Sequence, residues 1–87
     1  PAKMSSGVSF SKVRAYWRIT ALAPGSPAEA AGFEEGDLVI RLNGEPVEEW
    51  DLNRYNDLVD AGGAIDYTFL QGREEVTISA DCFALVP

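Results

Sequence analysis

The chain has 87 residues, of which 46% are hydrophobic and 24% are charged. Its 14 acidic residues outnumber the 7 basic ones, and the resulting net charge of −7 argues against binding to nucleic acid or to anionic membranes. Because histidine is absent, the sequence holds no Ser-His-Asp triad and no imidazole ligand for a metal. Its one cysteine, Cys82, lacks companions for an intrachain disulfide or a metal site, and no apolar run approaches the roughly 20 residues of a membrane-spanning helix.

The length and the ordinary hydrophobic fraction predict one folded domain over residues 1–87. The chain begins at Pro1 without a signal-peptide pattern, so we expect it to be excised from a larger protein.

The N-terminal third predicts two strands after a lead-in at Pro1 to Ser6. Gly7 to Ser11 alternates apolar and polar residues, as a short half-buried strand does. Lys12 to Ala15 is polar and is interpreted as a loop. Tyr16 to Leu22 is rich in aromatic and β-branched residues and predicts a second strand.

A short helix is indicated by its two ends. Ser26 suits the N-cap, Pro27 the first helical position, and Glu29, three residues after Ser26, completes a capping box. Gly32 can adopt the left-handed conformation that ends such a helix. The spacing predicts a helix of barely two turns.

The second half predicts a strand at Leu38 to Leu42, a hairpin turn at Asn43-Gly44, and a longer helix between Trp50 and Ala61. One face of this helix is apolar, and it consists of Leu52, Tyr55, Leu58 and Val59. Two further strands follow around residues 65–70 and 76–80, and the apolar tail Phe83 to Val86 can add a last one. These elements predict an α+β domain: a small, partly open antiparallel β-barrel or sandwich of five to six strands capped by two helices.

The ordered set of motifs resembles a PDZ domain. The resemblance is carried by Gly7-Val8-Ser9-Phe10, by the turn and helix from Pro24 to Phe33, and by the segments Gly36 to Ile40 and Leu42 to Val47. It is most similar to the bacterial form found in HtrA-type, C-terminal processing and retropepsin-like aspartyl proteases. That form implies a circular permutation, in which a C-terminal strand replaces the first strand, and the sequence leaves little room for a strand before Gly7.

The resemblance implies a peptide-binding groove without catalysis. A peptide would be added as a strand beside the second strand of the family fold, with its terminal carboxylate held by backbone amides of Val8, Ser9 and Phe10. Ser9 stands where the family pattern has glycine, a departure that bears on the shape of the loop. The implied site residues are Lys3, Gly7, Val8, Ser9, Phe10, Ser11, Asp51, Tyr55, Leu58 and Val59.

Each of these residues also has a purely structural interpretation. Gly7 to Phe10 can be plain strand entry, Lys3 a solvated lysine near the chain end, and Asp51 a helix cap. Tyr55, Leu58 and Val59 face the core under either interpretation. The acidic pairs Glu34-Glu35 and Glu48-Glu49 are interpreted as solvated turns, because adjacent residues do not face each other across a cleft.

We therefore predict a module that recognises C-terminal or unfolded segments by β-strand addition and presents or gates substrates for an attached protease. Its partner is a peptide or a protein C-terminus, with no cofactor, metal, nucleic acid or membrane insertion. The alternatives are a scaffold domain of a non-protease, such as a secretion component, and a small enzyme, for which no nucleophile or metal site is visible. The family resemblance implies a location in the bacterial envelope or periplasm, or outside the cell.

Overall fold

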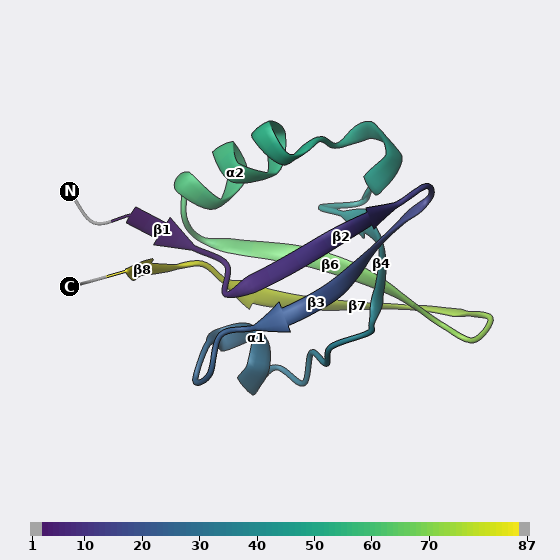
Figure 1. Ribbon diagram of the computed structural model, residues 1–87, viewed down its shortest axis with the longest axis horizontal. Helices are drawn as coiled ribbons and strands as arrows, with labels where there is room; N and C mark the ends of the chain where they lie inside the picture. Colours follow the sequence, from purple (N-terminus) through teal and green to yellow (C-terminus); the bar gives the residue numbers. More distant parts are fainter. Residues whose placement is uncertain (1–2, 86–87) are drawn as a thin grey trace.

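The computed structural model describes residues 3–85, which form two sheets and two α-helices (Figure 1). The strands are β1 (Lys3–Ser5), β2 (Val8–Val13), β3 (Tyr16–Leu22), β4 (Leu38–Leu42), β5 (Glu45–Pro46), β6 (Ala64–Gln71), β7 (Glu74–Asp81) and β8 (Phe83–Leu85). The helices are α1 (Pro27–Ala30) and α2 (Leu52–Asp60), and a 3₁₀ turn, η1 (Val47–Glu49), precedes α2.

The larger sheet is antiparallel and has the order β2-β3-β4-β6-β7, with β5 paired to β4. β1 and β8 pair separately at the end of the molecule where both chain termini lie, and the β6–β7 hairpin projects at the opposite end (Figure 1). The predicted α+β class with a mostly antiparallel sheet and two helices is confirmed. The sheet does not close into a barrel, because β2 and β7 lie at its two ends.

The start of the chain differs from the expectation in two respects. A strand, β1, does precede Gly7. It forms because it pairs with β8, and its Met4, which lies opposite Ala84, packs on the core. The replacement of a first strand by a C-terminal one is therefore not confirmed; Val86, the end of the predicted tail, lies outside the described residues. The predicted loop from Lys12 was also wrong, since Lys12 pairs with Trp17 and β2 continues to Val13.

Aromatic rings hold the layers together. Trp17, Tyr67 and Phe69 are fully buried, and Phe33 places its ring edge-on against Tyr67 and Phe69 at centroid distances of 5.0 and 4.8 Å. Each such pair contributes about 0.5–1.5 kcal/mol beyond the burial of its surface. The strands and the two helices share one core, to which α1 contributes Ala28 and α2 contributes Tyr55 and Val59.

The capping box of α1 forms in a modified version. The Ser26 hydroxyl accepts from the Glu29 amide at 3.2 Å, as predicted. The Glu29 carboxylate accepts from the amide of Gly25 at 3.0 Å, because the Ser26 amide already donates to the Ala23 carbonyl. The cap thus fixes the turn before the helix as well as the helix itself.

Gly7 lies directly against this cap. Its φ is +75°, and a Cβ at this position would lie 2.7 Å from Ser26 Cβ and 3.1 Å from the Phe83 ring. Its carbonyl accepts from the Ala23 amide at 2.8 Å. Only glycine satisfies both the left-handed backbone and the close approach, and Gly7 therefore joins the β1–β2 loop to the start of α1.

We predict that Gly7→Ala lowers the free energy of unfolding by about 2–4 kcal/mol, because left-handed strain and overpacking add. Gly25→Ala is the matched control, since Gly25 has φ +73° but nothing within 4 Å of an added Cβ. It should lose only the backbone contribution, about 1–2 kcal/mol. Urea denaturation of both variants measures the difference, and equal losses would contradict the close packing of Gly7.

Candidate functional site: an edge strand beside a helix

β2 offers an unpaired backbone edge. It ends the larger sheet, and within residues 3–85 no strand pairs with its outer side. In an antiparallel ladder, alternate residues of an edge strand point their N–H and C=O groups away from the sheet. α2 lies alongside this edge (Figure 1). The arrangement leaves a row of backbone donors and acceptors beside a helix.

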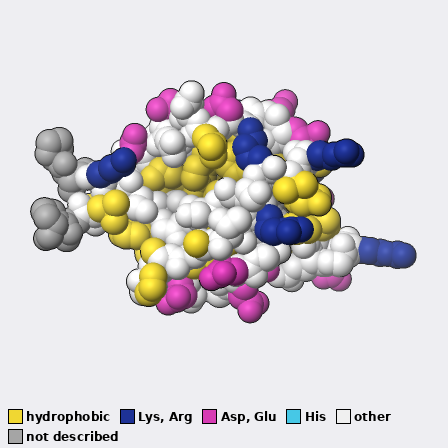
Figure 2. Space-filling view, in the orientation of Figure 1, with side chains coloured by type: hydrophobic (Ala, Val, Ile, Leu, Met, Phe, Trp, Pro, Cys, Tyr) yellow, Lys and Arg dark blue, Asp and Glu magenta, His cyan; other side chains and the backbone are white. Residues whose placement is uncertain are grey.

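An aromatic contact joins β2 to α2. The Phe10 ring of β2 lies edge-on to the Tyr55 ring of α2 at 5.5 Å and tilted against Trp17 at 5.4 Å. Figure 2 shows apolar side chains gathered between α2 and β2; the partly buried Val8, Phe10 and Leu58 pack on the core from these two elements. No deep pocket opens on the described part of the chain. The site is therefore a shallow apolar surface along the edge of β2.

Two tyrosine hydroxyls lie beneath this surface. Tyr55 Oη and Tyr67 Oη are 2.9 Å apart and buried. Burial raises the pKa of both groups, and for Tyr67 the neighbouring Tyr55 hydroxyl raises it further. Both therefore stay neutral and hydrogen-bonded to each other, which satisfies the polar end of Tyr55 within the core.

The loop before β2 is shaped by serine hydroxyls. The Gly7 amide donates to Ser5 Oγ at 3.0 Å, and the Val8 amide donates to Ser6 Oγ at 3.3 Å. One of the three amides expected to hold a carboxylate, that of Val8, therefore has an internal acceptor. The ladder between β2 and β3 also shifts register between Ser9 and Phe10, at the residue that departs from the family pattern.

At the end of the site where α2 begins, Lys12 and Arg54 both contact Trp50. Lys12 Nζ donates to the Trp50 carbonyl at 3.4 Å and lies 5.6 Å from the centroid of the Trp17 ring. The Arg54 guanidinium stacks over the Trp50 ring at 3.7 Å and pairs with Glu45 Oε2 at 2.8 Å. Such exposed ion pairs contribute little stability, but together these contacts fix where α2 begins relative to β2.

The structure brings together part of the predicted site. Val8, Phe10 and Leu58 form the shared apolar surface, Tyr55 packs beneath it in the core, Gly7 shapes the loop, and Val59 is buried in the core. Lys3, Ser9 and Ser11 are exposed on β1 and β2. Asp51 Oδ1 accepts from the Arg54 amide at 2.7 Å, which makes Asp51 the N-cap of α2. A role of Asp51 or Lys3 in binding stays a prediction.

Sequence reasoning missed three contributions to the site. Lys12 was assigned to a loop, although Phe10 and Lys12 continue the alternation of β2 onto the same face. The hydroxyls of Ser5 and Ser6 follow the known tendency of serine to bond backbone groups two residues on. The partnership of Tyr55 with Tyr67 has no local signal, because the two residues meet only through the tertiary fold.

Comparison with known proteins identifies the family. The PDZ domain family model matches residues 18–65, which is more than half of the chain. The chain therefore belongs to the PDZ domain family, and it is a non-catalytic module. Within residues 3–85 no group of three His, Cys, Asp or Glu side chains is placed to hold a metal ion, and no helix has the length and apolar character to cross a membrane.

The relatives include proteases and also rhophilin-1 of Mus musculus, which is 47% identical over 32 residues, and this chain spans less than a tenth of the curated proteins it matches. The chain is 52% identical over 31 residues to the putative protease Do-like 14 of Arabidopsis thaliana, covering 36% of this chain and 7% of that protein. The HtrA-type protease AlgW with a tripeptide superposes with a TM-score of 0.78 at 17% identity, over 98% of this chain and 33% of that one. The PDZ domain of the carboxy-terminal protease of Vibrio cholerae in complex with peptide gives 0.75 at 20% identity, over the whole of both chains.

The buried tyrosine pair predicts a pH dependence. Both hydroxyls have a folded-state pKa above the ordinary value of 10.0, so above about pH 10 the unfolded chain releases protons that the folded chain retains. The free energy of unfolding should accordingly be intact below pH 10 and fall above it. We expect the absorbance of tyrosinate to show that two of the three tyrosines ionise only when the domain unfolds. In Tyr55→Phe only one tyrosine, Tyr67, should still ionise together with unfolding. Reversible ionisation of all tyrosines in the folded protein would contradict the buried pair.

Proposed function

We propose that this domain binds extended peptide segments by adding them as a strand to β2, with the peptide C-terminus at the loop from Gly7 to Phe10. The observation that carries the proposal is the unpaired edge of β2 beside α2. An added strand would pair with the free backbone groups, and its alternate side chains would lie on the apolar surface formed by Val8, Phe10 and Leu58. Two similar structures support the proposal, because AlgW was solved with a tripeptide and the Vibrio cholerae domain in complex with a peptide.

The remaining predicted residues take defined roles in this proposal. The amides of Ser9 and Phe10 hold the terminal carboxylate, and the amide of Val8 joins them when the ligand displaces Ser6 Oγ. Lys3 supplies a positive charge from β1, and Asp51 favours a hydroxyl or basic side chain two residues before the ligand's end. In the parent protein the bound segment is presented to an attached protease, and the parent works in the bacterial envelope or outside the cell.

A second candidate is binding that ignores the terminal carboxylate. It is favoured by the bond from the Val8 amide to Ser6 Oγ and by the absence of a deep pocket in the described residues. A domain of this kind would capture an internal segment or a folded partner, as a scaffold does. The two candidates differ in one property, which is their response to amidation of the ligand's C-terminus.

We predict that a fluorescent peptide with a hydrophobic C-terminal residue binds at least tenfold more tightly than its C-terminally amidated twin, because the loop amides interact with the charge. Val8→Asp should weaken binding of the free-acid peptide about tenfold or more, because the new carboxylate repels the terminal carboxylate of the peptide at the loop. Fluorescence anisotropy measures both affinities.

Val76→Asp is the control for this substitution, since Val76 is also half-buried but lies on β7, at the opposite edge of the sheet. Its affinity should match that of the unchanged protein, and urea denaturation shows whether both variants fold. Equal binding of the acid and amide peptides would support the scaffold candidate and remove the carboxylate role of the loop. Unchanged binding by folded Val8→Asp would remove this loop from the site.

A further inference from the structure

The charges of this chain are unevenly distributed. All 14 acidic residues follow residue 28, whereas Lys3, Lys12, Arg14 and Arg18 precede it. Three of these four cations lie on the hairpin of β2 and β3, the element that provides the open edge. Figure 2 shows Lys and Arg side chains over this face, with Asp and Glu along α2 and the lower margin of the molecule. A protein of net charge −7 therefore presents a positive strip beside its peptide-binding edge.

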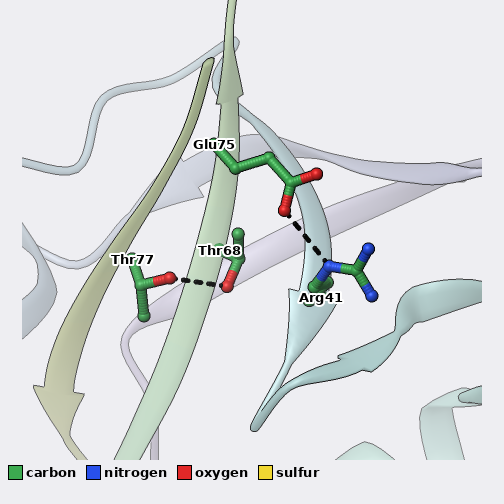
Figure 3. A network of polar contacts seen from close by, with 4 residues as sticks. All are labelled: Arg41, Thr68, Glu75 and Thr77. Carbon is green, nitrogen blue, oxygen red and sulfur yellow. Dashed lines mark hydrogen bonds and ion pairs between the residues drawn. The ribbon is translucent and has the colours of Figure 1, made fainter.

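The cations of this strip have no carboxylate partners among the described residues. Elsewhere Arg41 pairs with Glu75 at 3.2 Å (Figure 3), and Arg54 pairs with Glu45 at 2.8 Å. Within residues 3–85 no Asp or Glu oxygen lies within 4.0 Å of the charged nitrogens of Lys12, Arg14 or Arg18. Lys12 Nζ is held at the Trp50 carbonyl on the side of α2, so the charges of Arg14 and Arg18 are the ones available to a ligand on the outer face.

Arg18 is placed to reach an added strand. It lies opposite Ser11 in the β2–β3 ladder, and both residues are exposed on the face that points away from the core. Neighbouring strands are about 4.8 Å apart, so a strand added to β2 would lie about 10 Å from β3, with only the small Ser11 side chain between. An arginine side chain extended across Ser11 can meet a carboxylate on the outer face of the added strand.

The two sides of the added strand meet different charges: the outer side faces Arg18, whereas on the α2 side the Asp51 carboxylate stands near the Lys12 ammonium at the Trp50 carbonyl. Successive side chains of a strand point to opposite faces. If the C-terminal side chain faces α2, the side chain two positions earlier also faces α2, near Asp51. The side chains one and three positions before the end then face outward, beside Ser11 and Arg18. Acidic residues are accordingly favoured at these outer positions and disfavoured at the position between them.

We propose that the ligands of this domain are peptides with acidic side chains one and three positions before a hydrophobic C-terminal residue. The proposal rests on the strand addition proposed above and assigns the ligand class of that site. Arg18 determines the preference by charge pairing across Ser11, and Arg14, in the turn of the same hairpin, adds to the positive field on this side.

The test compares three peptides that differ only in charge placement. One carries Glu at the two outer positions, one carries Gln there, and one carries a single Glu at the position facing α2. We expect the first to bind about fivefold more tightly than the Gln peptide at about 0.05 M salt, with the ratio approaching one at about 0.5 M. The third should bind no better than the Gln peptide.

Arg18→Gln should abolish the preference for the first peptide while leaving affinity for the Gln peptide within about twofold. Arg73→Gln is the matched control, since Arg73 lies in the exposed turn of the β6–β7 hairpin at the far end of the molecule and should keep the preference (Figure 1). If all three peptides bind equally, the acidic ligand class is overturned while strand addition stands. If Arg18→Gln keeps the preference, the role of Arg18 is overturned. If no free-acid peptide binds, the proposed function fails and this inference fails with it.

Discussion

The arrangement of the site depends on the packing of Tyr55 against the sheet. Its ring lies edge-on to Phe10 and Trp17 at 5.5 and 5.6 Å, and its hydroxyl bonds that of Tyr67 beneath them. These contacts connect α2 to β2, β3 and β6 and so fix how far the helix stands from the open edge. Because the hydroxyl is satisfied inside the core, the ring is held in one place, and the apolar surface between helix and edge strand keeps its shape.

The loop and the hairpin at the two ends of β2 complete the site in different ways. Because Gly7 has no side chain, the loop packs directly against Ser26. The hydroxyls of Ser5 and Ser6 accept from the Gly7 and Val8 amides and so orient the loop backbone. The hairpin carries Arg14 and Arg18, which have no carboxylate partner within residues 3–85. In the proposed mode of binding, the backbone edge accepts an added strand, and the two ends of β2 select the chain terminus and the side chains of that strand.

Much of this fold could be predicted because its signals are local. The strand from Tyr16 to Leu22 and the cap at Ser26 follow from short patterns that the tertiary structure leaves unchanged. The strand β1 could not be found in this way, because Lys3 to Ser5 becomes a strand only through pairing with β8, about 80 residues away along the chain. In the site, the apolar surface was predictable from the spacing of α2, whereas the role of Ser6 and the pairing of Tyr55 with Tyr67 depend on contacts that no periodicity reveals.

Hydrogen exchange of the backbone amides, with and without a free-acid peptide, tests the central claim that ligands extend the sheet at β2. We expect alternate amides of β2, those pointing away from β3, to gain protection when the peptide is added. The amides of β7, at the other end of the sheet, should exchange at unchanged rates. Protection confined to β7, or binding with no new protection in β2, would contradict strand addition at this edge.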